Sequence, residues 1–68
     1  MEEMIYTVAE TARILKTNVA YVHELRKAKQ LKFLKLGMWK VRKQELERFL
    51  KDSEGLDLTD PYNPKIIE

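Results

Sequence analysis

The sequence predicts a mainly α-helical domain with one small β-hairpin, in the order helix, turn, helix, hairpin, helix. Three observations support this: a capping pattern at Thr7 and Glu10, a second helical stretch at 18–29, and a Gly37-Met38 turn inside an alternating segment. A chain of 68 residues has room for one domain. We assign it to residues 1–54 and residues 55–68 to an extended C-terminal tail.

The first helix begins after Thr7, whose side chain can cap it together with Glu10. It runs to about Leu15, and its inward face consists of Val8, Ala12 and Leu15. The turn that follows has only two residues, so the next helix has to cross the first steeply, as in a helix-turn-helix.

The second helix spans residues 18–29, with Asn18 as its N-cap and with Val22 and Leu25 facing the core. Its outward face mixes a small residue, an aromatic ring, an imidazole, a carboxylate and an ammonium. That mixture suits a helix that reads base edges in the DNA major groove, and it also suits an ordinary solvated helix. The candidate base-reading residues are Ala20, Tyr21, His23, Glu24 and Lys27.

Residues 33–42 predict the hairpin, with Gly37-Met38 as a two-residue type II′ loop. In the register that this loop implies, the opposed pairs are Leu36 with Trp39, Leu34 with Val41, and Lys35 with Lys40. The apolar pairs would face the core, with Trp39 beneath the hairpin. The two lysines would repel each other on the outer face unless an anion lay against them, or they would simply extend into water.

The third helix covers Lys43 to about Lys51, and its apolar side consists of Leu46, Phe49 and Leu50. Beyond it, two prolines at 61 and 64 exclude a helix from the tail. The apolar residues of the tail are expected to pack on the domain or on a neighbouring protein. A chain ending at Glu54 is expected to fold without them.

Charge is distributed unevenly. Residues 26–43 hold eight basic residues and no acidic one, whereas residues 51–68 carry a net charge of −3. A basic stripe beside an acidic tail is typical of a nucleic-acid-binding protein, and the alternative is a solvated lysine-rich surface. The candidate DNA-backbone and wing residues are Arg26, Lys29, Lys32, Lys35, Met38, Lys40, Arg42 and Lys43.

Composition argues against several classes of protein. With no cysteine and one histidine, the sequence predicts no disulfide, no metal site and no cofactor. It offers no pocket of paired carboxylates and little room for a cleft, so we expect no enzyme activity. No apolar run approaches the roughly 20 residues of a membrane span, and no signal peptide is evident. We therefore expect a soluble cytoplasmic protein with no membrane partner.

From Tyr6 to Leu50 the sequence resembles the excisionase family, relatives of the MerR-type winged helix-turn-helix proteins. The matching residues are Tyr6-Thr7-Val8, Glu10, Ala12, Leu15, Val22, Leu25, Gly37, Trp39, Lys40-Val41-Arg42, Lys43-Gln44-Glu45-Leu46 and Phe49-Leu50. Three positions depart from the pattern: Lys16 and Lys29 stand where the family usually has glycine, and Arg26 stands where an apolar residue is common.

The resemblance implies a winged helix-turn-helix that places its second helix in the major groove and its wing on the flanking backbone or minor groove. Excisionases act with the integrase of a phage or conjugative element, bind cooperatively at repeated sites, bend DNA and bias recombination toward excision. Double-stranded DNA, an integrase and further copies of the chain are the implied partners, in a bacterial or mobile-element setting. The alternatives are a stand-alone transcription regulator, and an antitoxin or adaptor that grips its partner with the tail.

Overall fold

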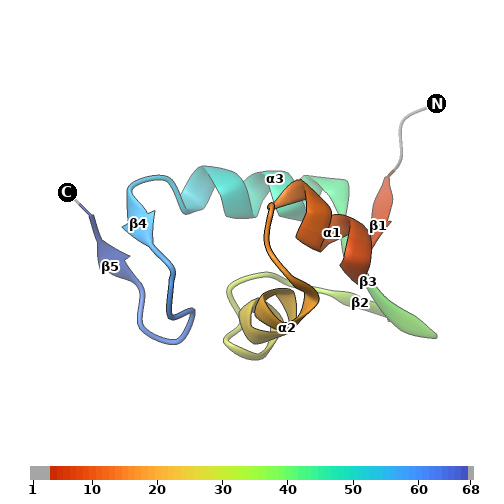
Figure 1. Cartoon of the computed structure of the whole chain (residues 1–68). Coiled ribbons are helices and arrows are strands. Elements are labelled where there is room, and N and C mark those ends of the chain that lie inside the picture. Colours follow the sequence, from red (N-terminus) through yellow and green to blue (C-terminus); the bar gives the residue numbers. More distant parts are fainter. Residues whose placement is uncertain (1–3, 68) are drawn as a thin grey trace.

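The computed structural model describes residues 4–67. Its elements are β1 (Ile5–Thr7), α1 (Val8–Ile14), α2 (Val19–Lys27), β2 (Leu34–Leu36), β3 (Met38–Arg42), α3 (Lys43–Asp52), β4 (Leu56–Asp57) and β5 (Lys65–Ile66). Strands β1, β3 and β2 form an antiparallel sheet in that order, whereas β4 pairs with β5 in a separate hairpin. In Figure 1 the wing, formed by β2 and β3, and the β4–β5 hairpin lie at opposite ends of the molecule, with α2 between them.

This arrangement confirms the predicted winged helix-turn-helix. Its core takes one or two buried apolar side chains from each of the three helices, one from β3 and one from the connector after α2, and Val22 in α2 is fully buried as predicted. Leu50, predicted to face inward, is instead 46% exposed. Within the described range, no helix has the length and apolar content needed to cross a bilayer. The clustered core residues are Leu25, Leu31, Val41, Leu46 and Phe49.

The helix starts follow the sequence prediction. The Thr7 N–H donates to Glu10 Oε1 at 2.8 Å, and the Glu10 N–H donates to Thr7 Oγ1 at 3.0 Å. At the start of α2, the Tyr21 N–H donates to Asn18 Oδ1 at 2.7 Å. Each bond satisfies a backbone group that has no partner within the helix, so the two short helices begin at defined residues.

Each helix of the helix-turn-helix is followed, directly after its C-cap residue, by a lysine with left-handed backbone: Lys16 at φ 58° and Lys29 at φ 63°. After α1, the Lys16 N–H donates to the Arg13 carbonyl at 3.1 Å, and the Thr17 N–H donates to the Ala12 carbonyl at 2.9 Å. The same pair of bonds closes α2, from Lys29 to Arg26 and from Gln30 to Leu25, both at 3.0 Å. This is the Schellman geometry, in which glycine is favoured because a Cβ is strained at positive φ.

We expect Lys29→Gly and Lys16→Gly each to stabilise the protein by about 0.5–1 kcal/mol, because glycine adopts positive φ without the Cβ clash. Urea unfolding followed by circular dichroism measures the change. Lys27→Gly, at the last residue of α2, is the matched control and should destabilise by up to a similar amount. Equal losses of stability for Lys27→Gly and Lys29→Gly would show that the left-handed turn carries no strain.

The wing register differs by one residue from the prediction. The observed pairs are Leu36 with Met38, Lys35 with Trp39, and Leu34 with Lys40, so the turn centres on Gly37 alone, at φ +77°. Phe33 packs on the core and meets the Trp39 ring edge-on, with 6.2 Å between ring centroids. Because side chains alternate along a strand, Leu34 and Leu36 then fall on the other face of the wing. The predicted Lys35–Lys40 opposition is therefore wrong.

Strand β1 adds a third strand that the sequence analysis did not identify. It pairs with β3 through Ile5–Arg42, Tyr6–Val41 and Thr7–Lys40. The Lys43 N–H, at the start of α3, donates to the Met4 carbonyl at 2.8 Å. A three-residue strand carries too short a pattern to be recognised by alternation, although Tyr6 and Val41 lie side by side because of it.

The sequence predicted an extended tail after residue 54, but residues 55–67 contain the β4–β5 hairpin. Its connecting segment is held by local bonds: the Thr59 N–H donates to Asp57 Oδ1 at 2.9 Å, and the Tyr62 N–H to Asp60 Oδ1 at 3.0 Å. Leu58 packs on the core and Pro61 is buried. The prolines that excluded a helix, together with the aspartates that accept these bonds, thus specify a folded turn.

Candidate nucleic-acid interface

Helix α2 presents one exposed stripe between two flanking structures. Val22 and Leu25 point into the core with no exposed surface, whereas Ala20 and Lys27 are exposed and His23 is half-buried. On a helical wheel Val19, His23 and Arg26 lie toward one edge of the stripe, and Tyr21 and Glu24 toward the other. The wing contacts the first edge, and the β4–β5 hairpin contacts the second (Figure 1).

Trp39 connects the wing to α2. The Arg26 guanidinium lies 4.4 Å from the centre of the Trp39 ring, and the Lys35 ammonium is also 4.4 Å from it. The contact of Arg26 with Trp39 joins α2 to the wing, whereas Lys35 and Trp39 both belong to the wing. Arg26 Nε also donates to His23 Nδ1 at 3.3 Å, so a neutral His23 carries its proton on Nε2. The Nε2–H group is then the donor that His23 has left to offer a ligand.

A groove of about 410 Å³ separates α2 from the wing. Val19 and His23 line it from the helix, Trp39 and Lys40 line it from β3, and the start of α1 closes its end. Its walls are largely apolar, with lysines at the wing side. The lysines give the wing side of this groove a positive charge, which favours an anionic ligand.

The β4–β5 hairpin holds two of the predicted base-reading residues. The Tyr21 hydroxyl donates to the Leu58 carbonyl, and burial, together with the nearby charge of Asp57, raises the Tyr21 pKa above its ordinary value. A hydrogen bond to the Glu24 carboxylate, more than burial, raises the pKa of Tyr62. The Tyr21 hydroxyl therefore holds α2 against the hairpin and does not point outward, where a base would lie. The Glu24 carboxylate already has a hydrogen-bond partner, Tyr62, in the hairpin segment.

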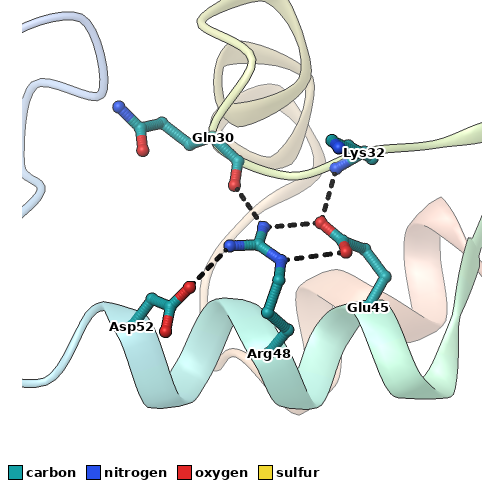
Figure 2. Close-up of polar contacts among 5 residues, drawn as sticks. All are labelled: Gln30, Lys32, Glu45, Arg48 and Asp52. Atoms are coloured by element: carbon teal, nitrogen blue, oxygen red, sulfur yellow. Dashed lines mark hydrogen bonds and ion pairs between the residues drawn. The ribbon is translucent and has the colours of Figure 1, made fainter.

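Helix α3 fixes the connection between α2 and the wing (Figure 2). From α3, Arg48 donates to both carboxylate oxygens of Glu45, at 3.0 and 2.6 Å, and to the Gln30 carbonyl at 3.0 Å. Glu45 in turn accepts from the Lys32 N–H at 3.0 Å. Arg48 also bonds Asp52 at 3.0 Å. These contacts hold the segment that leaves α2, and thereby the start of the wing.

The hydrogen bond from Arg48, more than the Lys32 N–H, lowers the pKa of Glu45 below its ordinary 4.5. The ionised carboxylate therefore stabilises the fold above pH 4.5, and that contribution is lost as the pH falls through the lower, folded pKa. We expect Arg48→Gln to cost about 1 kcal/mol at pH 7, since the guanidinium is 43% exposed. It should also make the melting temperature fall less between pH 5 and roughly pH 3.

Thermal melts across this pH range measure the effect, with Glu47→Gln, an exposed acid on the same helix, as the control. If the wild type and Arg48→Gln lose stability equally between pH 5 and roughly pH 3, the Arg48–Glu45 pair does not hold the connector in solution.

The structure distributes the basic candidates over four places: α2, the connector after it, the wing and the start of α3. Arg26, half-buried, packs on Trp39, while Lys29 and Lys32 are exposed in the connector between α2 and the wing. Within the wing, Lys35 covers one face of Trp39, and Lys40 lies on the opposite face of the ribbon beside the exposed Met38. Arg42, bonded to Gln44 at 3.0 Å, and the half-buried Lys43 mark the start of α3.

The α2 stripe and the wing form one side of the domain, and no acid occurs in the chain between Glu24 and Glu45.

Sequence reasoning missed the residues that orient this side of the domain. Arg26 was placed on the DNA backbone, although its contact with Trp39 joins helix to wing. The bracing by Leu58 and Tyr62 was also missed, because the pairs that they form span more than 30 residues of chain. An aromatic residue in a wing and an arginine at an apolar position of the helix were the available signals.

Comparison with known protein families matches residues 5–53 to the family described as a helix-turn-helix domain. The match runs from β1 through α3 and leaves out the β4–β5 hairpin. Neither the curated proteins nor the solved structures contain a match to the chain. Domains of this type bind double-stranded DNA through the second helix. The chain therefore belongs to the helix-turn-helix domain family of DNA-binding proteins.

Proposed function

We propose that this DNA-binding protein is an excisionase, which bends its site and biases integrase-mediated recombination toward excision in the cytoplasm of a bacterium. The observation that carries the proposal is the basic side formed by α2 and the wing, with no acid between Glu24 and Glu45. The resemblance from Tyr6 to Leu50 supports the recombination role.

In this proposal α2 lies in the major groove. Ala20, His23 and Lys27 form its base-facing stripe, with the His23 Nε2–H and the Lys27 ammonium as donors to guanine N7 and O6. Glu24, at 3.9 Å from the Lys27 ammonium, orients that side chain, and Tyr21 acts behind the helix as a brace. The basic residues of the connector, the wing and the start of α3 face phosphates: Lys29, Lys32, Lys35, Lys40, Arg42 and Lys43.

The salt dependence of DNA affinity distinguishes contacts with phosphates from contacts with bases. Lys40→Ala should weaken binding to selected and random duplexes by similar factors and reduce the slope of log affinity against log salt by about one. Lys27→Ala, if Lys27 reads a base, should cost about 1–3 kcal/mol on the selected duplex and less on random DNA. Fluorescence anisotropy with a duplex selected from a random library and a scrambled duplex gives both quantities. An unchanged slope for Lys40→Ala would place the wing off the DNA.

The recombination role needs a second experiment. The protein is expressed with the integrase encoded nearest to its gene and with a plasmid that carries the two recombined attachment sites. An excisionase should raise integrase-dependent excision, and Lys27→Ala should abolish that increase. Specific DNA binding without any effect on excision would favour the transcription regulator, which uses the same DNA-binding side.

An adaptor or antitoxin is the second candidate, because Tyr62, Ile66 and Ile67 of the C-terminal hairpin are 57%, 81% and 63% exposed. Exposed apolar side chains gathered on one short hairpin suit a protein partner. Loss of the effect on excision in Ile66→Ser, with DNA affinity unchanged, would show that this hairpin serves a partner within the same system.

A further inference from the structure

The tip of the wing carries two large apolar side chains that are exposed to solvent. Leu36 is 58% exposed and Met38 is 72% exposed, on either side of Gly37. They are paired across the turn, so they project from the same face of the ribbon. We call them the apolar tip pair. Neither contributes to the core, and a hairpin has no structural need for them.

The surroundings of the apolar tip pair are basic. Next along the same face comes Lys40, paired with Leu34, and then Arg42; Lys35 precedes Leu36 in β2. Glu10, at the cap that follows β1, is already bonded to the Thr7 N–H. A second copy of this chain would meet the patch with the same basic residues, and a symmetric contact would bring like charges together. A polyanion is the partner whose charge is complementary.

The shape of the tip also fits one part of DNA. A single glycine, Gly37, joins the paired Leu36 and Met38, so the ribbon ends in a tight turn with open space around it. The minor groove, about 6 Å wide, admits such a tip but not the whole ribbon. Minor-groove proteins commonly insert leucine or methionine between base steps, and the duplex kinks there.

We propose that the apolar tip pair inserts from the minor groove into a flexible base step, such as TpA, and kinks the DNA beside the site bound by α2. The proposal rests on the proposed function, since α2 and the basic wing have to bring the tip to DNA. It gives the bend a specific physical origin: two neutral side chains unstack one step while lysines hold the flanking phosphates.

The experiment uses the full chain and a duplex recovered from a random library on the wild-type protein. One copy of the duplex carries a fluorescence-transfer pair at its ends, and others carry 2-aminopurine in place of single adenines at its TpA steps. Wild type should shorten the end-to-end distance and raise the 2-aminopurine signal at one step. The double variant Leu36→Ser and Met38→Ser should remove both signals, weaken binding about tenfold and leave the salt slope unchanged, because neither side chain is charged.

Two controls identify the cause. Ile66→Ser with Ile67→Ser changes an equally exposed apolar pair on the C-terminal hairpin and should leave the bend intact. Exchanging the pair, Leu36→Met with Met38→Leu, keeps two apolar side chains and should retain the bend. Circular dichroism verifies that every variant is folded.

If wild type binds and bends the duplex but the serine variant bends it equally, the apolar tip pair has no such role. The same conclusion follows if the serine variant abolishes self-association, measured by sedimentation, and leaves the 2-aminopurine signal unchanged. Failure of the wild type to bind any duplex would overturn the proposed function itself, and the two failures are therefore distinguishable.

Discussion

Val22→Asp should leave the protein unfolded at room temperature. Val22 has no exposed surface, and it lies in α2, which packs against α1. An aspartate there has to bury a charge without a partner, or shift its pKa and remain protonated, and either costs several kcal/mol. A domain of 68 residues has about that much stability in total. Far-ultraviolet circular dichroism and a thermal melt should show no cooperative transition.

Val19→Asp provides the matched control for this substitution. Val19 opens the same helix but is 43% exposed, so its carboxylate would remain in water. It also adds an acid to the first turn of α2, which has none, and a negative charge there interacts favourably with the helix dipole. A Val22→Asp protein that melts within a few degrees of Val19→Asp would mean that the helix-turn-helix packing is wrong.

Removal of the C-terminal hairpin should have the second largest effect. A chain ending at Glu54 loses the packing of Leu58 on the core, the Tyr21 hydroxyl bond, and the bond from Gln30 Nε2 to the Pro61 carbonyl at 2.9 Å. Together these should stabilise the fold by about 2–4 kcal/mol. The melting temperature should fall by on the order of 10–20 °C. This expectation replaces the one drawn from sequence, in which residues 1–54 fold unaided.

A chain ending at Pro64 separates the two parts of the hairpin. It lacks β5, whose residues are exposed, and the bond from the Ile67 N–H to the Gly55 carbonyl at 2.9 Å, but it keeps Leu58 and Pro61. Its stability should lie close to that of the whole protein. Equal stability of the chain ending at Glu54 and the whole chain would show that the bracing of α2 is weak in solution.

The hairpin of the wing was predicted correctly, but its side chains were assigned to the wrong faces. Alternation and glycine located the hairpin, but a two-residue loop and a turn centred on Gly37 differ by one residue in register. That single step moved Leu36 from the core to the tip and brought Lys35 onto Trp39. In the observed register Phe33 packs on the core and meets the Trp39 ring edge-on, and this contact could not be predicted from the residues of the loop.

The sequence by itself determined the helix starts, the buried stripe of α2 and the basic side of the domain, because caps, periodicity and charge are properties of neighbouring residues. It also marked Lys16 and Lys29 as unusual, and both have the left-handed backbone that normally favours glycine. Only the tertiary structure decided the third strand, the wing register and the bracing of α2 by Leu58 and Tyr62. Each of these depends on side chains that meet after the chain has folded, and the energy of such a contact depends on both partners.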